Sequence, residues 1–289
     1  MKPGPSLICT KISNAIALDA SPRAAVEIIT EIIVTECWFR NASEAREKAE
    51  VWEKAVLERL RNQLNALLEI GKPARFAFNT SSEYMVQGAC FVEPKDPEGL
   101  KEQKKRRLQF SDYYRVISGL TPHRFELLGG KLIGLLGVER PIVTRTSADE
   151  GIDFYGKLAL GSIFFPHDLS PTIQNQLSIW LIGQAKHYQA IQSGTPEIRD
   201  LAGAIMLGRA GAFGSVESPV INLNIRAADP VFALFVTTGT LSGSAWRLLQ
   251  RSGIIGMDGE MLAAFLADRG VLESPSGFDE AAFIKWIES

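Results

Sequence analysis

The stretches DEGIDFYG (residues 149–156) and IWLIGQAKHY (residues 179–188) decide the fold, because each predicts a short strand next to polar residues. In the second stretch, alternate residues share one face of a strand: Trp180, Ile182, Gln184 and Lys186. A lysine on the same face as two apolar side chains loses part of its hydration. We therefore expect a carboxylate or a phosphate beside Lys186.

The composition predicts a folded protein with two ordinary domains. The chain has 289 residues, of which 46% are hydrophobic and 22% are charged. The net charge of -2 and the pI near 6.0 exclude a strongly basic protein. Any affinity for nucleic acid must therefore come from local basic patches.

The cysteines and the N-terminus predict a cytoplasmic protein. Cys9, Cys37 and Cys90 lie far apart and show no CxxC spacing, which suits a reducing compartment. Lys11 interrupts the apolar stretch near the N-terminus, and no run of about 18 residues is apolar and uncharged. We expect neither a secretory signal nor a membrane span.

Residues 1–108 predict a mainly helical α+β domain of unassigned role: recognition, regulation or oligomerisation. Ser21 as N-cap and Pro22 at the first helical position predict one helix, and a long amphipathic helix follows from Ser43 to Ile70. Internal packing of the long helix is favoured over packing against a partner. Two short strands are expected within residues 73–92, followed by an exposed polar connector, residues 93–107.

Residues 109–289 predict an α/β domain, since helices and strands alternate after Thr121. Thr121 and Pro122 predict the start of a helix that Gly137 ends. The remaining expected helices are 194–211, 242–253 and 259–270, and the expected strands are 140–146, 151–156, 177–186, 231–238 and 254–259. This alternation favours a sheet with at least partly parallel pairing.

Six segments in order resemble the Mrr-like restriction endonucleases of the PD-(D/E)xK nuclease superfamily: FELLGGKLIGLLG, DEGIDF, GQAKHY, EIRDLAGA, VTTGTLS and IIGMDGEML. The resemblance covers roughly residues 121–270. It implies a restriction-endonuclease-like mixed sheet flanked by helices. It also implies a magnesium-dependent deoxyribonuclease, with Mn²⁺ as a substitute metal, that hydrolyses DNA phosphodiester bonds in restriction or anti-phage defence.

The resemblance also implies roles for individual residues. Asp153 is the expected principal metal ligand, Lys186 the catalytic lysine, and Gln184 occupies the usual acidic position, as in the Q-x-K variant of the Mrr-like branch. Glu126 is an expected accessory carboxylate, and the backbone carbonyl of Ala185 a further oxygen ligand. Phosphodiester hydrolysis requires such oxygen ligands for a hard cation and a positive charge near the phosphate.

Further residues are candidates for contacts to double-stranded DNA. His187 and Tyr188 follow the lysine and either line a DNA cleft or pack at the sheet edge. The densest basic run of the chain is either a phosphate-binding surface or a solvated connector: Lys104, Lys105, Arg106 and Arg107. Asp149 and Glu150, in the turn before Asp153, either approach the expected metal or are ordinary polar turn residues. Phe164 and Phe165 in the following loop cap the cleft, contact DNA bases or pack on a partner, and packing is favoured.

Double-strand cleavage needs two active sites, so we expect a homodimer or a higher oligomer, alone or with a partner protein of a defence system. Two other functions stay open: a non-cleaving DNA-binding or sensor module with a degenerate site, and a repair or junction-resolving nuclease. The string GIDFYGKL matches the glycine and lysine spacing of a P-loop, but Leu158 stands where a Ser or Thr would hold Mg²⁺, so we reject a P-loop.

Overall fold

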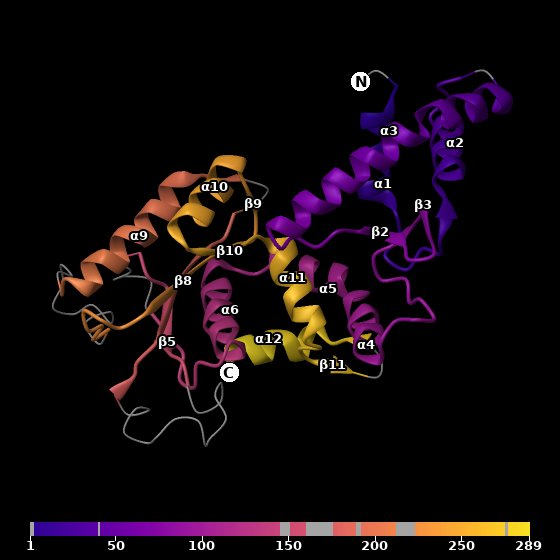
Figure 1. Cartoon of the computed structure of the whole chain (residues 1–289). Coiled ribbons are helices and arrows are strands. Elements are labelled where there is room, and N and C mark those ends of the chain that lie inside the picture. Colours follow the sequence, from indigo (N-terminus) through magenta and orange to yellow (C-terminus); the bar gives the residue numbers. More distant parts are fainter. Residues whose placement is uncertain are drawn as a thin grey trace. The chain divides into compact units, whose positions relative to one another are not determined.

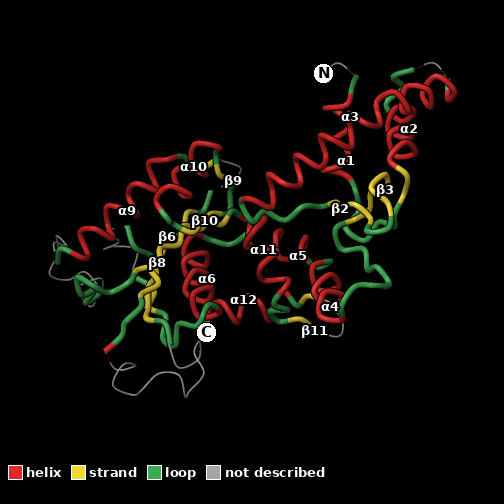
Figure 2. The backbone as a smooth tube through the Cα atoms, viewed as in Figure 1, coloured by secondary structure: helices red, strands yellow, loops and turns green. Residues whose placement is uncertain are grey.

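The computed structural model describes residues 3–39, 41–144, 151–159, 176–188, 192–211, 223–274 and 277–289 (Figures 1 and 2). The chain divides into two compact units. One comprises Met1–Ser111 with Ala264–Glu273, and the other comprises Asp112–Ala263 with Ser274–Ser289. None of the helices within the described ranges is long and apolar enough to span a bilayer.

The first unit packs helices against a small sheet. Its helices include α1 (Pro5–Ala15), α2 (Ala25–Thr35), α3 (Ala42–Glu69) and α4 (Glu98–Arg107), and the antiparallel sheet has the order β1 (Arg23–Ala24), β3 (Ser82–Gly88), β2 (Phe76–Asn79). Apolar faces of α1, α2 and α3 share one core, which includes Ile8, Ile29, Ile33, Val56 and Leu60. The expected internal packing of the long helix is therefore confirmed.

Two sequence expectations for this unit are wrong. The helix expected from Pro22 begins only at Ala25, because Arg23 and Ala24 pair with Val86 and Met85 of β3. The polar segment expected to be a connector contains the helix α4, whose side chains are held by ion pairs. In both places, contacts with residues distant in sequence override the local pattern.

The second unit is built on a five-stranded mixed sheet with the order β10-β8-β6-β5-β4. Strands β4 (Ile142–Val143), β5 (Phe154–Lys157) and β6 (Trp180–Lys186) are antiparallel neighbours. Strands β8 (Val231–Thr237) and β10 (Ile255–Met257) continue the sheet parallel to β6. The predicted α/β fold with a mixed, partly parallel sheet is confirmed.

Helices cover both faces of this sheet. On one face lies α6 (Pro122–Leu135), which Thr121 caps as predicted and against which α12 (Glu280–Glu288) packs. On the other face lie α9 (Thr195–Arg209) and α10 (Gly243–Ser252), whose apolar side chains meet Trp180, Ile182 and Phe235. The remaining elements are α5 (Phe110–Ser118), α11 (Gly259–Asp268), β7 (Gln192–Ser193), β9 (Thr240–Leu241), β11 (Glu273–Ser274) and β12 (Gly277–Phe278).

Glycines let α6 approach the sheet closely. Phe154 of β5 is fully buried, and its ring lies between Gly129 of α6 and Gly183 of β6. A Cβ atom built on Gly129 would lie 2.3 Å from the ring, and one built on Gly183 would lie 2.2 Å from it. Both positions therefore require glycine for space, and this packing fixes β6 just before Gln184.

Candidate active site

The candidate site lies where β5 begins and β6 ends. The antiparallel register pairs Phe154 with Gly183, so Asp153 and Gln184 are the next residues outward on the two strands. Asp153 is 3% exposed and Gln184 is 2% exposed. Two polar side chains at this depth need polar partners, because an unpaired buried polar group is costly.

Asp153 is held by backbone contacts from both neighbouring segments. Its carboxylate Oδ2 accepts a hydrogen bond from the Ala185 amide at 2.6 Å, and its own amide donates to the Gly183 carbonyl at 2.9 Å. The Thr144 amide donates to the Asp153 carbonyl at 2.8 Å. The orientation of this carboxylate is therefore set by the pairing of β5 with β6.

Gln184 links the lysine to helix α9. Its amide is satisfied when Nε2 donates to the backbone carbonyl of Glu197 and Oε1 accepts from Lys186 Nζ, each at 3.2 Å. Gln184 and Lys186 therefore share the α9 face of β6, as the alternation predicted. Lys186 is partly buried, and the group that accepts from its ammonium is a neutral amide oxygen.

Glu197 is a carboxylate beside this cluster that the sequence analysis missed. Its Oε1 accepts a hydrogen bond from the Tyr188 hydroxyl at 3.0 Å, while Oε2 is buried and has no hydrogen-bond partner among the residues that the structure describes. Burial and the bond to Glu197 raise the pKa of Tyr188 to about 12. An acid in the first helical turn is ordinary in sequence, and only the fold shows that it meets Tyr188.

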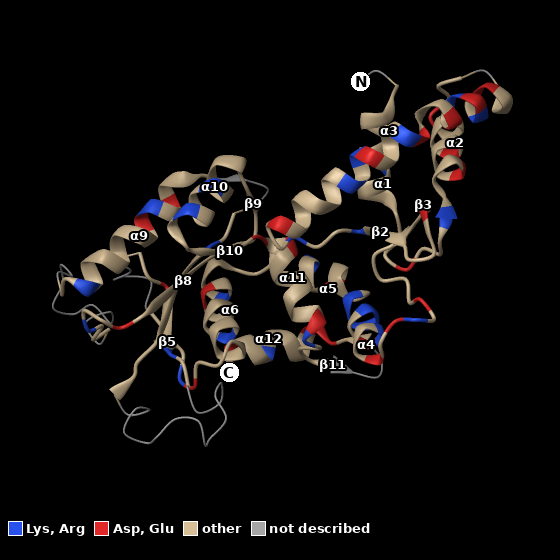
Figure 3. Cartoon of the chain, in the orientation of Figure 1, with Lys and Arg blue, Asp and Glu red and all other residues tan. Residues whose placement is uncertain are grey.

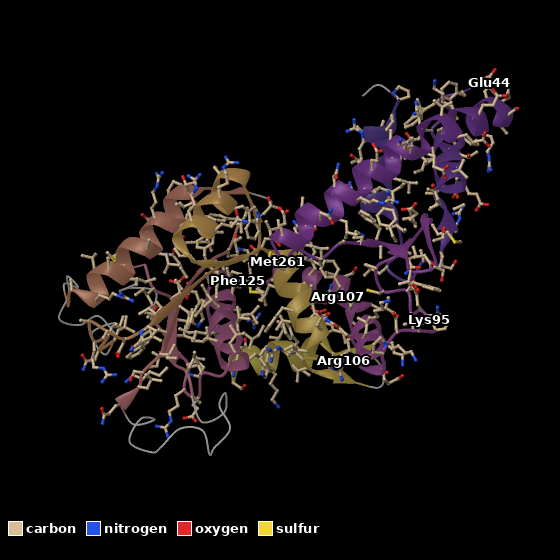
Figure 4. The ribbon with its side chains drawn as sticks, viewed as in Figure 1. Glu44, Lys95, Arg106, Arg107, Phe125 and Met261 are labelled. Atoms are coloured by element: carbon tan, nitrogen blue, oxygen red, sulfur yellow. The ribbon has the colours of Figure 1, made fainter. Side chains whose placement is uncertain are left out.

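His187 points to the other face of the sheet. Its ring lies 6.1 Å from the ring of Phe125 on α6, centroid to centroid, and its Nε2 is buried without a hydrogen-bond partner in the described part of the chain. Glu126 follows Phe125, and its side chain is 13% exposed, with Oε2 3.6 Å from His123 Nδ1. Glu126 is thus the chain neighbour of the α6 residue that the His187 ring contacts, Phe125, which is labelled in Figure 4.

The basic run on α4 belongs to the first unit and is partly engaged within it. Lys104 Nζ lies 2.7 Å from Asp96 Oδ2 and 2.8 Å from the Phe91 carbonyl, and this ammonium holds the pKa of Asp96 below its usual range. Arg107, labelled in Figure 4, pairs with Asp268 through two nitrogens. Burial alone would lower the pKa of Arg107, but the Asp268 carboxylate outweighs it and the pKa is raised.

Of the remaining two members of this run, Arg106 is half-buried like Lys104 and Arg107, whereas Lys105 is exposed. Lys105 is largely exposed and pairs with Glu102 at 2.7 Å. Lys104 and Arg107 can contact DNA only if their internal ion pairs open or are shared with a phosphate. Contacts of the α4 run, of His187 and of Tyr188 with DNA stay predictions.

The oxygen atoms at the strand ends match the chemistry of a hard divalent cation. No group of three or more His, Cys, Asp or Glu side chains that could hold a metal occurs among the described residues. Mg²⁺ is commonly bound through one or two carboxylates, with water and substrate phosphate completing its shell. Asp153 and Ala185 lie at the adjoining strand ends, whereas Glu126 lies on α6 with its carboxylate 3.6 Å from His123, so metal binding by these three groups stays a prediction. Asp149, Glu150, Phe164 and Phe165 lie outside the described residues.

Comparison with known proteins gives two distant structural likenesses. No family model matches the chain, and no curated protein matches it. The MspJI restriction endonuclease in complex with a 27-mer oligonucleotide is 19% identical with a TM-score of 0.38, covering 68% of this chain and 39% of that chain. The DNA modification-dependent restriction endonuclease AspBHI is also 19% identical with a TM-score of 0.38, covering 70% of this chain and 46% of that chain. This chain thus spans less than half the length of either protein, and a likeness at this level does not identify an activity.

Proposed function

We propose that this chain is a metal-dependent endonuclease that hydrolyses phosphodiester bonds in DNA. One observation carries the proposal: the buried Asp153 lies just before β5 and Lys186 ends the neighbouring strand β6, where the Ala185 amide orients Asp153 and the Gln184 amide holds Lys186. A carboxylate and an ammonium at neighbouring strand ends are suited to a phosphate that is attacked by water. Use in restriction or anti-phage defence follows from the Mrr-like resemblance.

Asp153 and Glu126, with the Ala185 carbonyl, are the groups that would hold Mg²⁺ or Mn²⁺. When bound, such a cation polarises the phosphate and lowers the pKa of a bound water. A carboxylate has about four lone-pair sites, so the bond from Ala185 does not by itself prevent Asp153 from meeting a cation. Lys186 donates hydrogen bonds to the phosphate or to the attacking water, and it stabilises negative charge that develops on the phosphate oxygens.

Cleavage of supercoiled plasmid in Mg²⁺ or Mn²⁺ tests this function. Asp153→Asn keeps the shape of the side chain and removes its charge, and Lys186→Met keeps much of the length of the lysine. Loss of one preorganised charge is expected to slow cleavage by at least about a hundredfold. The matched controls Asp112→Asn and Lys285→Met remove the same charges at exposed positions of the same unit and should cleave as wild type does. Wild-type rates in both site variants would refute the proposal.

A non-cleaving DNA-binding module is the second candidate, and Gln184 is the observation that favours it. A neutral amide replaces a carboxylate that would otherwise add negative charge for a cation. Calorimetric titration with Mn²⁺ separates the two functions if plasmid remains intact. Metal binding that Asp153→Asn abolishes would favour an enzyme that requires a particular DNA or partner, while no binding would favour the non-cleaving module.

We also propose that the active form is a homodimer or a larger homo-oligomer. Cutting both strands of a duplex requires two active sites, and the described strand ends provide one set of site residues in each chain. Light scattering with and without duplex DNA measures the mass. A monomer that converts supercoiled plasmid only to nicked circles would contradict the expected dimer.

A further inference from the structure

Building on the proposed nuclease function, we infer that exposed arginines on α9 and α10 form a contact surface for the phosphate backbone of duplex DNA. The arginine surface consists of Arg199, Arg247 and Arg251. All three side chains are exposed, and within the described part of the chain none of them forms an ion pair. The sequence as a whole gives no sign of this surface, because its net charge is -2.

The topology brings the beginnings of the two helices together. Strands β6 and β8 are parallel, with Lys186 paired with Thr237 at their ends. The segments that follow pair again in parallel, Gln192 with Thr240 and Ser193 with Leu241, as β7 and β9. Helix α9 begins two residues after Ser193, and α10 begins two residues after Leu241. The helices therefore start level with each other, near the sheet edge at which Lys186 lies.

This common register places two of the arginines at matching positions. Arg199 is the fifth residue of α9 and Arg247 is the fifth residue of α10. Arg251 follows Arg247 by one helical turn on the same face. The opposite faces of the helices are packed in a shared core that includes Ile198 and Leu249, which leaves the arginines on the outer side.

The Arg247 side chain folds back over the first turn of α10. Its Nη1 lies 3.7 Å from the position that a Cβ on Gly243 would occupy. The guanidinium is therefore directed toward the helix start, on the side of the sheet edge with Lys186. Arg199 and Arg251 are also exposed on the outer side of their helices, where a DNA strand that runs along both helices could contact them.

The local charge favours an anionic partner. Helix α10 contains two arginines and no Asp or Glu, whereas α9 contains Glu197 and Asp200. Because Glu197 accepts a hydrogen bond from Tyr188, the exposed carboxylate of Asp200 is the acid that most offsets the positive charge of the arginine surface. Figure 3 shows Lys and Arg positions in blue on both helices. The N-termini of α9 and α10 each add about half a positive charge at this edge.

The spacing also fits a nucleic-acid backbone. Packed helices have axes about 8–10 Å apart. Along the duplex axis one DNA strand rises about 3.4 Å per phosphate, so a separation of about 8–10 Å along that axis corresponds to roughly two or three nucleotides. Arginine binds phosphate through two parallel hydrogen bonds and is suited to such contacts. The contacts carry no sequence information and would position the duplex for Lys186.

The test is the salt dependence of duplex binding. Fluorescence anisotropy with a labelled 20-base-pair duplex in EDTA measures binding without cleavage, from about 50 to 200 mM salt, a range in which phosphate contacts dominate the change. The test variant is Arg199→Gln/Arg247→Gln/Arg251→Gln. The control Arg115→Gln/Arg140→Gln/Lys285→Gln removes the same charge from exposed positions elsewhere in the same unit. Thermal unfolding checks that both variants fold.

We expect the slope of log K against log salt to fall by about 2 to 3 in the test variant, since each lost phosphate contact lowers it by about 0.9. Affinity should fall at least tenfold at the lowest salt, and the control should match wild type. An unchanged slope in a folded test variant, equal losses in both variants, or no duplex binding by wild type would each overturn the arginine surface. The plasmid assay with Asp153→Asn judges the nuclease function separately.

Discussion

Gly183→Ala should destabilise the second unit strongly, because no neighbour can move away from the added methyl group. The new Cβ would lie 2.2 Å from Cε2 and 2.3 Å from Cζ of Phe154, and 3.0 Å from the Leu234 carbonyl oxygen. Carbon atoms in contact are normally about 3.5–4.0 Å apart, so the overlap is more than about 1 Å. The Phe154 ring is blocked on its other edge, where the Cβ position of Gly129 is 2.3 Å away.

The expected cost of Gly183→Ala lies at the upper end of the usual overpacking range, about 3 kcal/mol. For a unit of this size, each kcal/mol shifts the melting temperature by about 2–4 °C, so we expect a loss of roughly 6–12 °C. Differential scanning calorimetry measures it. Because Gly183 precedes Gln184 on β6, plasmid cleavage should fall as well.

Gly203→Ala is the matched control for this substitution. Gly203 lies in α9, where an added Cβ meets no described atom within 4 Å, so alanine should stabilise the helix by about 0.5–1 kcal/mol. The double variant Gly183→Ala/Phe154→Leu makes room for the methyl group and should be less destabilised than the sum of the single changes by at least about 1 kcal/mol. A Gly183→Ala protein that melts within about 2 °C of wild type would refute the packing argument.

Three further predictions concern the site and the thiols. Burial and a bond to a carboxylate raise the folded-state pKa of Tyr188 to about 12, whereas the unfolded chain loses this proton near pH 10, so the contribution of Tyr188 to stability is complete below about pH 10 and falls between pH 10 and 12. When the free energy of unfolding is measured in urea at pH 9 and at pH 11.5, Tyr188→Phe should therefore lose less stability than wild type. Gln184→Met removes the amide that holds Lys186, so plasmid cleavage should fall at least tenfold while duplex binding changes less than threefold, and equal losses would contradict the positioning role. Burial raises the pKa of the Cys90 thiol to about 11, so at pH 8 Ellman's reagent should label exposed Cys37 rapidly and Cys90 only after unfolding.

Local patterns predicted most elements of the second unit. Thr121 and Ser242 each accept a hydrogen bond at a helix start, which is the contact that capping residues make in any helix. Alternation in the segment that became β6 correctly placed Gln184 and Lys186 on one face, because strand geometry depends only on the local backbone. These predictions needed no knowledge of distant residues.

Features that depend on distant contacts could not be predicted. Pairing of Arg23 with Val86 displaced the start of α2, and Arg107 met Asp268 across 161 residues of sequence. Glu197 appeared as an ordinary first-turn acid, although its backbone carbonyl accepts from Gln184. The level starts of α9 and α10 follow from the β7–β9 pairing, two strands of two residues each that have no sequence signature.

The hydrogen bond from Gln184 to the backbone carbonyl of Glu197 on α9 gives a physical reason for glutamine at position 184. The side chain is almost completely buried and faces two different groups, a backbone carbonyl that needs a donor and an ammonium that needs an acceptor. A carboxamide satisfies both, whereas a glutamate would place a carboxylate oxygen 3.2 Å from the Glu197 carbonyl and lose a buried hydrogen bond, at a cost of about 1–3 kcal/mol. Gln184→Glu should therefore lower stability even though it restores the acid of the superfamily pattern. A neutral partner also leaves the positive charge of Lys186 uncompensated by Gln184, and that charge remains available for a phosphate.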